Sequence, residues 1–441
     1  MNRVLIVSCA LEVVGGGEVV TAWMLQALRG DYDLSLLSWT KSVELDEINR
    51  VFGTALTQGD FKLLGPPPPL RAVFDFVAKL RPEHEFQKAC LLYRLARRMN
   101  SDYDLVISAS DEMDFGRPGI QYVHYPSFKS LYETEKGTVS QGRIVRWWRL
   151  FSQRCRPWRI LSGLSFDGVK ENFTLVNSDW TGDVVGQLYG IETQTVYPPV
   201  AGEFSDVGWE QRKNRFVCIG RFVPHKRLEM VIEILGAVRA LGHDVALKLI
   251  GLVWNDAPGR AYYRTILELA REHPWVSVAE KIDRRELAEI VSQSRYGIHA
   301  ADSEPFGIAV AEMVRAGCIA FTGRVGGQAE IIGQDERLLF GTVEEGVEKI
   351  VAVLNSPPQQ LILRQQLAGR GTLFDSVRFV SRFREAVRQF EAQQSAARGA
   401  LTIGQVPRIE ATVADRSPTS HRQTQPVPAR FDKAAGEAER P

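Results

Sequence analysis

Two carboxylates stand at the ends of an apolar stretch in SEPFGIAVAEM, at residues 303–313. Glu304 and Glu312 lie eight positions apart, which corresponds to about 12 Å along a helix. We therefore predict that one acid binds the head of an elongated ligand and that the other binds its tail. The alternative is that Glu304 stabilises the helix dipole and that Glu312 is a solvated surface residue.

The residues just after the first acid favour phosphate binding. Pro305 suits the first turn of a helix, with Ser303 or Glu304 near its N-cap, so the pattern predicts a helix over residues 305–316. The free N–H groups and the positive dipole end of such a helix attract a diphosphate, and Gly307 permits close approach.

Two more loops with useful chemistry follow apolar, strand-like runs. In GRFVPHK at residues 220–226, Arg221 and Lys226 are able to neutralise a leaving diphosphate without a metal. The alternative is a basic surface turn that caps the next helix. GGQAEII at residues 326–332 has glycines suited either to contact with a ligand or to a simple tight turn.

The first half of the chain contains three further candidates. GGGEVV at residues 15–20 is neither GxGxxG nor a P-loop, and a flexible turn is its alternative. His124 follows the apolar run QYV, where it could contact a ligand, although a lone histidine is more often structural. DEMD at residues 111–114 resembles a metal site, but a polar loop is the better interpretation, and we expect no metal.

The elements that must position these residues alternate between short apolar runs and amphipathic helical patterns. The rhythm begins with a strand over residues 3–8, stops near Pro198 and Pro199, and restarts at RFVCIG. Two successive βα series predict an α/β protein with two doubly wound, Rossmann-like domains facing across a cleft. Ligands of such sheets bind beyond the carboxyl ends of the strands, which is where the candidate residues lie.

Composition excludes other classes of protein. The chain has 54 Lys and Arg against 53 Asp and Glu, a balance that gives no reason to expect nucleic acid. Five scattered cysteines without a CxxC spacing predict reduced thiols in a cytoplasmic protein. The N-terminal apolar run lacks a cleavage site and no later window is long enough to span a bilayer, so we expect neither a signal peptide nor a membrane anchor.

GRFVPHK, EPFGIAVAE and GGQAE, in this order, resemble the C-terminal domain of the family 4 retaining glycosyltransferases of the GT-B fold. The resemblance extends over residues 1–394. GGGE, YVHYP, VNSDWT and VYPP further resemble the mannosyltransferases that add α-1,2-mannose to dolichol-linked oligosaccharides from GDP-mannose. The resemblance implies transfer of a hexose with retention, without metal or cofactor, from a nucleotide sugar, with GDP-mannose favoured, to a lipid-linked or other glycan acceptor.

The resemblance also implies a role for each candidate residue. The catalytic candidates are Glu304 and His124, which contact the transferred sugar, while the leaving phosphate takes the proton of the incoming hydroxyl. Glu312 accepts hydrogen bonds from the ribose hydroxyls of the donor. The residues with donor-binding roles are Gly16, Gly17, Arg221, Lys226, Phe306, Gly307, Ile308 and Glu312.

The predicted domain limits follow the changes in pattern. Residues 1–200 are the N-terminal, acceptor-side domain and residues 201–375 the C-terminal, nucleotide-sugar-binding domain. Residues 376–396 are a helix that returns to the N-terminal domain, and residues 397–441, rich in Pro, Gln, Arg, Ala and Thr, are a disordered tail.

A basic and aromatic segment, RIVRWWRLFSQRCRPWR at residues 143–159, contains six arginines, three tryptophans and no acid. Such a segment suits an anionic membrane surface, and it predicts a peripheral location at the inner face of the membrane. The alternative is that the tryptophans are core residues and the arginines are solvated.

Two other functions are compatible with the same architecture. A nucleotide-sugar epimerase needs acid and base residues at the sugar carbon but no acceptor site. A non-catalytic sugar-nucleotide-binding or scaffold protein would retain the site without turnover, although the full set of motifs argues against it.

Overall fold

The computed structural model describes residues 1–12, 15–78, 84–136, 159–200, 202–253 and 257–402. It divides into two compact units, residues 1–384 and residues 385–441. Both sheets and all the candidate site residues belong to the first unit.

The first sheet is parallel and has the strand order β3-β2-β1-β4-β5-β6-β7. Its strands are β1 (Arg3–Ser8), β2 (Asp33–Ser38), β3 (Lys62–Leu64), β4 (Leu105–Ser108), β5 (Ile120–Val123), β6 (Phe173–Val176) and β7 (Gln194–Thr195). The helices of this half are α1 (Gly16–Leu28), α2 (Leu45–Phe52), α3 (Pro68–Ala78), α4 (His84–Met99), α5 (Lys129–Lys136), α7 (Phe166–Lys170) and α8 (Asp179–Tyr189), with the 3-10 turn η1 (Asn100–Asp102). In β1 and β2 every residue after the first is buried, as expected of strands covered on both faces.

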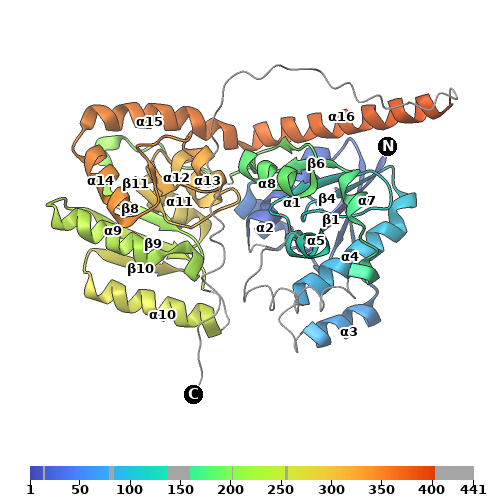
Figure 1. The fold of residues 1–441 in the computed structure, drawn as a ribbon, viewed down its shortest axis with the longest axis horizontal. Helices are drawn as coiled ribbons and strands as arrows, with labels where there is room; N and C mark the ends of the chain where they lie inside the picture. The colour runs from blue at the N-terminus through green and yellow to red at the C-terminus, as the bar shows by residue number, and fades with distance from the viewer. Residues whose placement is uncertain (13–14, 79–83, 137–158, 201, 254–256, 403–441) are drawn as a thin grey trace. The chain divides into compact units, whose positions relative to one another are not determined.

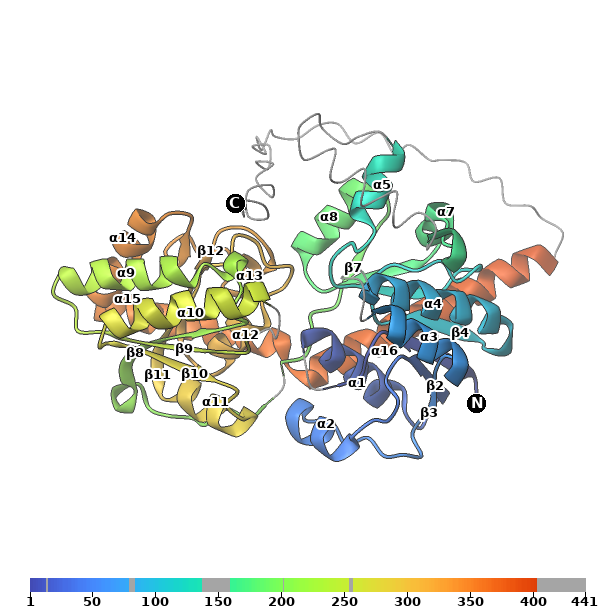
Figure 2. The same cartoon turned by 90° about the horizontal axis from the view of Figure 1, so that it is seen from below.

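The second sheet is also parallel, in the order β10-β9-β8-β11-β12-β13. Its strands are β8 (Lys213–Ile219), β9 (Ala246–Gly251), β10 (Val276–Glu280), β11 (Ser294–His299), β12 (Ile319–Gly323) and β13 (Leu339–Phe340). The helices are α9 (Leu228–Ala240), α10 (Ala257–Glu272), α11 (Arg284–Ser292), α12 (Ile308–Arg315), α13 (Gly327–Ile331), α14 (Val343–Leu354), α15 (Pro357–Gly371) and α16 (Ser376–Thr402), with the 3-10 turns η2 (Trp209–Gln211), η3 (Pro224–Lys226) and η4 (Thr372–Phe374). Figure 1 shows this sheet with its helices, and Figure 2, seen from below, shows α9 and α10 on one face of the sheet and α11 on the other. The predicted pair of doubly wound α/β sheets is confirmed.

The strand order of each sheet reverses beside its first strand. In the first sheet β1 lies between β2 and β4, and in the second β8 lies between β9 and β11. Loops that follow neighbouring strands diverge at such a switch point, which is where open α/β sheets bind ligands. The loop with GGGE follows β1, GRFVPHK follows β8 and EPFG follows β11.

The helix predicted over residues 305–316 begins later than expected. It starts at Ile308 with Gly307 as its N-cap, at φ 102°, a left-handed conformation that favours glycine. The prediction of Ser303 or Glu304 near the N-cap is therefore wrong, because Glu304 forms a backbone bridge with Gly326 instead of entering the helix. The two acids do not lie on one helix, so the spacing of about 12 Å does not apply to them.

Other parts of the prediction have different outcomes. The short strands β3, β7 and β13 were not predicted. The last helix, α16, runs to Thr402, further than the predicted end at residue 396. Arg384 of this helix is the last residue of the first unit, and its guanidinium pairs with the Asp31 carboxylate at 3.1 Å. The domain limits remain predictions, and residues 403–441 of the predicted tail lie outside the described residues.

Candidate functional site

Lys226 and Glu304 form an ion pair at the switch point of the second sheet. Lys226 ends the turn η3, which follows β8, and Glu304 lies just beyond β11. The lysine ammonium donates a hydrogen bond to Glu304 Oε2. Only 11% of the lysine side chain and 21% of the glutamate side chain are exposed. The candidate diphosphate cation and the candidate catalytic acid therefore meet in space.

Glu304 is held as a carboxylate. Burial raises the pKa of its carboxyl group, but several effects that lower it, of which the Lys226 charge is the largest, together outweigh burial, and the pKa lies below the ordinary value of 4.5. An ionised carboxylate accepts hydrogen bonds but donates none. Glu304 is thus suited to accept from hydroxyl groups of a ligand.

The backbone around Glu304 is fixed by the GGQAE loop. Gly327 N donates to Glu304 O at 2.9 Å, next to the bridge between Glu304 and Gly326. Phe306 is 4% exposed and its ring centroid lies 5.6 Å from that of Phe374. The Phe306 side chain is therefore part of the core and anchors the loop.

Glu312 is separated from the Lys226 pair and has its own cation. It lies in α12 with 8% of its side chain exposed and accepts a hydrogen bond from Arg284 at the start of α11. Arg284 was not singled out in the sequence. A carboxylate with two oxygens can accept from Arg284 and still accept from a ligand.

The glycine loop of the first sheet lies against residues of both halves of the first unit. A Cβ added to Gly16 would lie 2.4 Å from Ile308 Cδ1, and one added to Gly17 would lie 3.6 Å from His124 Nε2. With a larger residue at position 16, the end of the Ile308 side chain would have to move. The structure brings Gly16 close to Ile308 and Gly17 close to His124.

His124 has a defined tautomer. Its Nε2 lies 3.1 Å from Ala109 O, and because a carbonyl oxygen only accepts, Nε2 carries the hydrogen. The backbone N–H of His124 donates to Asp111 Oδ1 at 2.8 Å. The ring is thus oriented just beyond β5.

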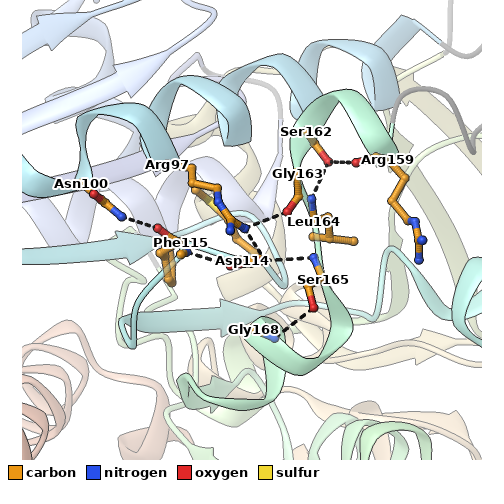
Figure 3. Close-up of polar contacts among 12 residues, drawn as sticks. Arg97, Asn100, Asp114, Phe115, Arg159, Ser162, Gly163, Leu164, Ser165 and Gly168 are labelled. Atoms are coloured by element: carbon orange, nitrogen blue, oxygen red, sulfur yellow. Dashed lines mark hydrogen bonds and ion pairs between the residues drawn. The ribbon is translucent and has the colours of Figure 1, made fainter.

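The acids of DEMD accept hydrogen bonds from neighbouring loops and helices. Glu112 is fully buried and accepts from Phe128 N at 2.9 Å. Asp114 accepts from Arg97 Nη1 and from Ser165 N, at 2.5 and 2.9 Å (Figure 3). These hydrogen bonds stabilise the loop that follows β4.

Arg221 is exposed, and its charge acts on Glu18 in the first turn of α1. Burial raises the pKa of the Glu18 carboxyl, and the Arg221 charge only partly opposes this shift. Arg221 and Glu18 thus place charge from both halves of the first unit near the glycine loop. Glu18 belongs to the GGGE motif, but no role for it was predicted.

Helix α8 of the first half has Ser178 as its N-cap, and an acid of the second half accepts further hydrogen bonds at this helix end. Glu330 Oε2 accepts from Asp179 N at 3.0 Å and Oε1 accepts from Trp180 N at 2.6 Å. Ser178 Oγ donates to Pro305 O at 2.5 Å. The EPFG and GGQAE loops are therefore both attached to the N-terminus of α8.

His299, the last residue of β11, is a buried neutral residue beside the ion pair. It is 2% exposed. Burial lowers its pKa from 6.5 to about 4, with the Lys226 charge acting in the same direction and Glu304 opposing it. The His225 charge also lowers the pKa, and of the effects given it is the smallest.

This shift predicts a pH dependence of stability. The unfolded chain binds a proton near pH 6.5 but the folded chain only near pH 4, so folding excludes the proton between these values. The free energy of unfolding should therefore fall as the pH drops from 6.5 towards 4, by up to about 3 kcal/mol. Urea denaturation at several pH values, for the unchanged protein and for His299→Asn, whose side chain does not titrate, checks this prediction. If the free energy of unfolding depended on pH in the same way in both proteins, the prediction would be contradicted.

The predicted membrane segment at residues 143–159 lies outside the described residues except for Arg159. Within the described chain, no helix combines the length and the apolar character needed to cross a bilayer.

The two parallel sheets and the site define a class of protein. Residues 202–371 match the family model of "Glycosyl transferases group 1". The chain has the GT-B fold. The solved structure of HepE from Anabaena, in complex with UDP and glucose, superposes with a TM-score of 0.60 over 88% of this chain and 100% of that chain at 13% identity. WaaG, a glycosyltransferase involved in lipopolysaccharide biosynthesis, gives a TM-score of 0.60 over 86% of this chain and 98% of that chain at 16% identity.

Sequence relatives share one name, GDP-Man:Man(3)GlcNAc(2)-PP-Dol alpha-1,2-mannosyltransferase. The protein from Candida glabrata is 29% identical over 46% of this chain and 43% of its own length. Those from Dictyostelium discoideum and Mus musculus are 25% and 26% identical, over 59% and 52% of this chain and 57% and 50% of their own lengths. The chain thus spans about half the length of the curated relatives it matches.

Proposed function

We propose that this protein is a retaining, metal-independent mannosyltransferase that uses GDP-mannose and a lipid-linked glycan acceptor. One observation carries the proposal: Lys226 and Glu304 form an ion pair at the switch point of a glycosyl transferases group 1 domain. The donor and acceptor are suggested by the shared name of the sequence relatives.

In this proposal each site residue binds a different part of the donor. Arg221 and Lys226 neutralise the diphosphate as it leaves, which replaces the charge of a metal ion. Glu304 accepts from hydroxyls of the transferred sugar, and Glu312 accepts from the ribose while Arg284 holds its other oxygen. The donor must displace Glu304 from Lys226, so that the acid turns to the sugar and the ammonium to the phosphate.

The acceptor enters from the side of the first sheet. His124, with its hydrogen on Nε2, orients the transferred sugar across from Glu304. The leaving phosphate takes the proton of the incoming hydroxyl on the same face, which gives retention. A lipid-linked acceptor implies that the protein works at the cytoplasmic surface of a membrane, with the basic segment at residues 143–159 as the proposed contact.

Transfer of labelled mannose tests the proposal directly. The protein is incubated with GDP-mannose and a lipid extract containing diphosphate-linked oligosaccharides, and the label in the lipid fraction is counted. We expect label in that fraction, equal rates with and without a chelator, and an α-linked product by NMR. Label released only as free mannose, or none transferred from either GDP-mannose or UDP-glucose, would refute this function.

A further inference from the structure

Arg71 is a partly buried cation that has no acid partner among the described residues. It lies near the start of α3, and its Nε is buried without a hydrogen-bond partner. The guanidinium, which carries several N–H donors, makes one long hydrogen bond, from Nη2 to Ser38 O at 3.5 Å. A buried donor of a charged group that lacks an acceptor is costly, and it marks a place where an anionic ligand is able to bind.

The Arg71 guanidinium lies at the carboxyl ends of two strands of the first sheet. Ser38 ends β2, and Gly65, where an added Cβ would meet Arg71 Nη2, directly follows β3. The residue after Ser38, Trp39, is attached to the loop after β1, because its N–H donates to Cys9 O at 3.3 Å. Ligands of parallel sheets bind at this edge, and the sheet belongs to the half that the proposed function gives to the acceptor.

Two cations lie over one aromatic ring at this edge. Arg71 Cζ is 5.8 Å and Lys88 Nζ of α4 is 5.7 Å from the centroid of the Trp39 ring. Asp75, an acid of α3, accepts from Trp39 Nε1 at 3.0 Å and makes no ion pair with Arg71. A planar guanidinium matches two oxygens of a phosphate, and the second positive charge favours a ligand with more than one negative charge. A diphosphate has both properties.

The side of α3 that is turned away from Trp39 is apolar and exposed. Val73 and Phe76 are 58% and 67% exposed, and residues three positions apart share one face of a helix. Phe74, by contrast, packs on Trp39, with ring centroids 5.9 Å apart. Exposed apolar side chains on the same short helix as an unpaired cation favour an amphiphile, in which a charged group is attached to a hydrocarbon chain.

We propose that Arg71, with Lys88 beside it, binds the diphosphate of the lipid-linked acceptor, and that Val73 and Phe76 contact the beginning of its hydrocarbon chain. This inference rests on the proposed function and names the site for the charged end of the acceptor. The hydroxyl that receives the sugar is separated from that diphosphate by the acceptor glycan. The diphosphate is therefore held at the ends of β2 and β3, apart from the donor loops.

The test is the affinity for farnesyl diphosphate, measured by calorimetry with excess GDP present to occupy the donor site. Inorganic diphosphate and farnesol are the comparison probes, and we expect each to bind at least about tenfold more weakly. Arg71→Gln should weaken the binding of farnesyl diphosphate about tenfold or more and leave the affinity for GDP within about twofold. Phe76→Ser should weaken farnesyl diphosphate about three- to tenfold and leave inorganic diphosphate unchanged.

Arg50→Gln is the matched control. Arg50 lies on α2 with 63% of its side chain exposed, so the same chemical change should alter none of these affinities. Thermal unfolding of Arg71→Gln distinguishes a ligand site from a structural role. Because Arg71 has no acid partner, we expect the melting temperature to change by only a few degrees. A large fall in melting temperature with unchanged affinity would show that stacking on Trp39 is its role, and would overturn the inference.

Three further results would overturn it. One is farnesyl diphosphate binding to Arg71→Gln as tightly as to the unchanged protein. Another is equal affinity for inorganic and farnesyl diphosphate, which would mean a site for free anions. The third is unchanged affinity in Phe76→Ser, which is decisive even if the Arg71 variant fails to fold, because this side chain is exposed. A protein that binds farnesyl diphosphate through Arg71 but transfers no mannose would instead refute the proposed function alone.

Discussion

Glu304→Gln is expected to lower kcat/KM for mannose transfer by about 100-fold or more, the range found when one preorganised electrostatic contact to a transition state is removed. The substitution retains the size of the side chain and one oxygen that accepts from Lys226, but it removes the charge. Steady-state kinetics with GDP-mannose measures the loss. Because the pair is largely but not fully buried, the melting temperature should change by only a few degrees.

Glu289→Gln provides the matched control. Glu289 pairs with Arg285 at 3.2 Å, but both side chains are exposed and lie on α11, so the same chemical change should leave both turnover and melting temperature as they were. Unchanged turnover in Glu304→Gln would remove this acid from the mechanism. A collapse of its melting temperature would instead show that the ion pair is chiefly structural.

The sequence was sufficient to predict the fold and the loops of the site for one physical reason. Strands covered on both faces leave continuous apolar runs, as in β1 and β8, and residues that follow those runs must gather at one edge of a parallel sheet. Lys226 and Glu304 were therefore predicted to share a site, although 78 positions separate them. His124 was located by the same rule, directly after β5.

What the sequence did not reveal depends on contacts between distant residues and on backbone conformation. No local sequence pattern predicts that Glu312 pairs with Arg284 or that Glu330 binds the start of α8. Gly307 and Gly326 could be recognised as glycines, but not as the positions where the chain turns left-handed and delays the start of α12. The edge strands β7 and β13, of two residues each, are too short to leave a periodic signal.

Gly326→Ala should be among the most damaging single substitutions in this chain. Gly326 has φ 107° and ψ 175°, a conformation that is essentially restricted to glycine. An added Cβ would lie 2.3 Å from Glu304 O and 2.6 Å from Glu304 N, and backbone atoms cannot move aside without moving Glu304 itself. We expect the free energy of unfolding to fall by about 3–5 kcal/mol, measured by urea denaturation, and GDP-mannose binding to be lost.

Gly242→Ala separates the two causes of this effect. Gly242 has φ 95°, but an added Cβ would meet nothing within 4 Å, so this variant carries the backbone strain without the collision and should cost about 1–2 kcal/mol. The difference between the two variants then measures how firmly the GGQAE loop holds the backbone of Glu304. An equal loss of stability in the two variants would mean that the contact between the added Cβ at position 326 and the Glu304 backbone is relieved at no cost. The GGQAE loop would then not be what holds Glu304 against Lys226.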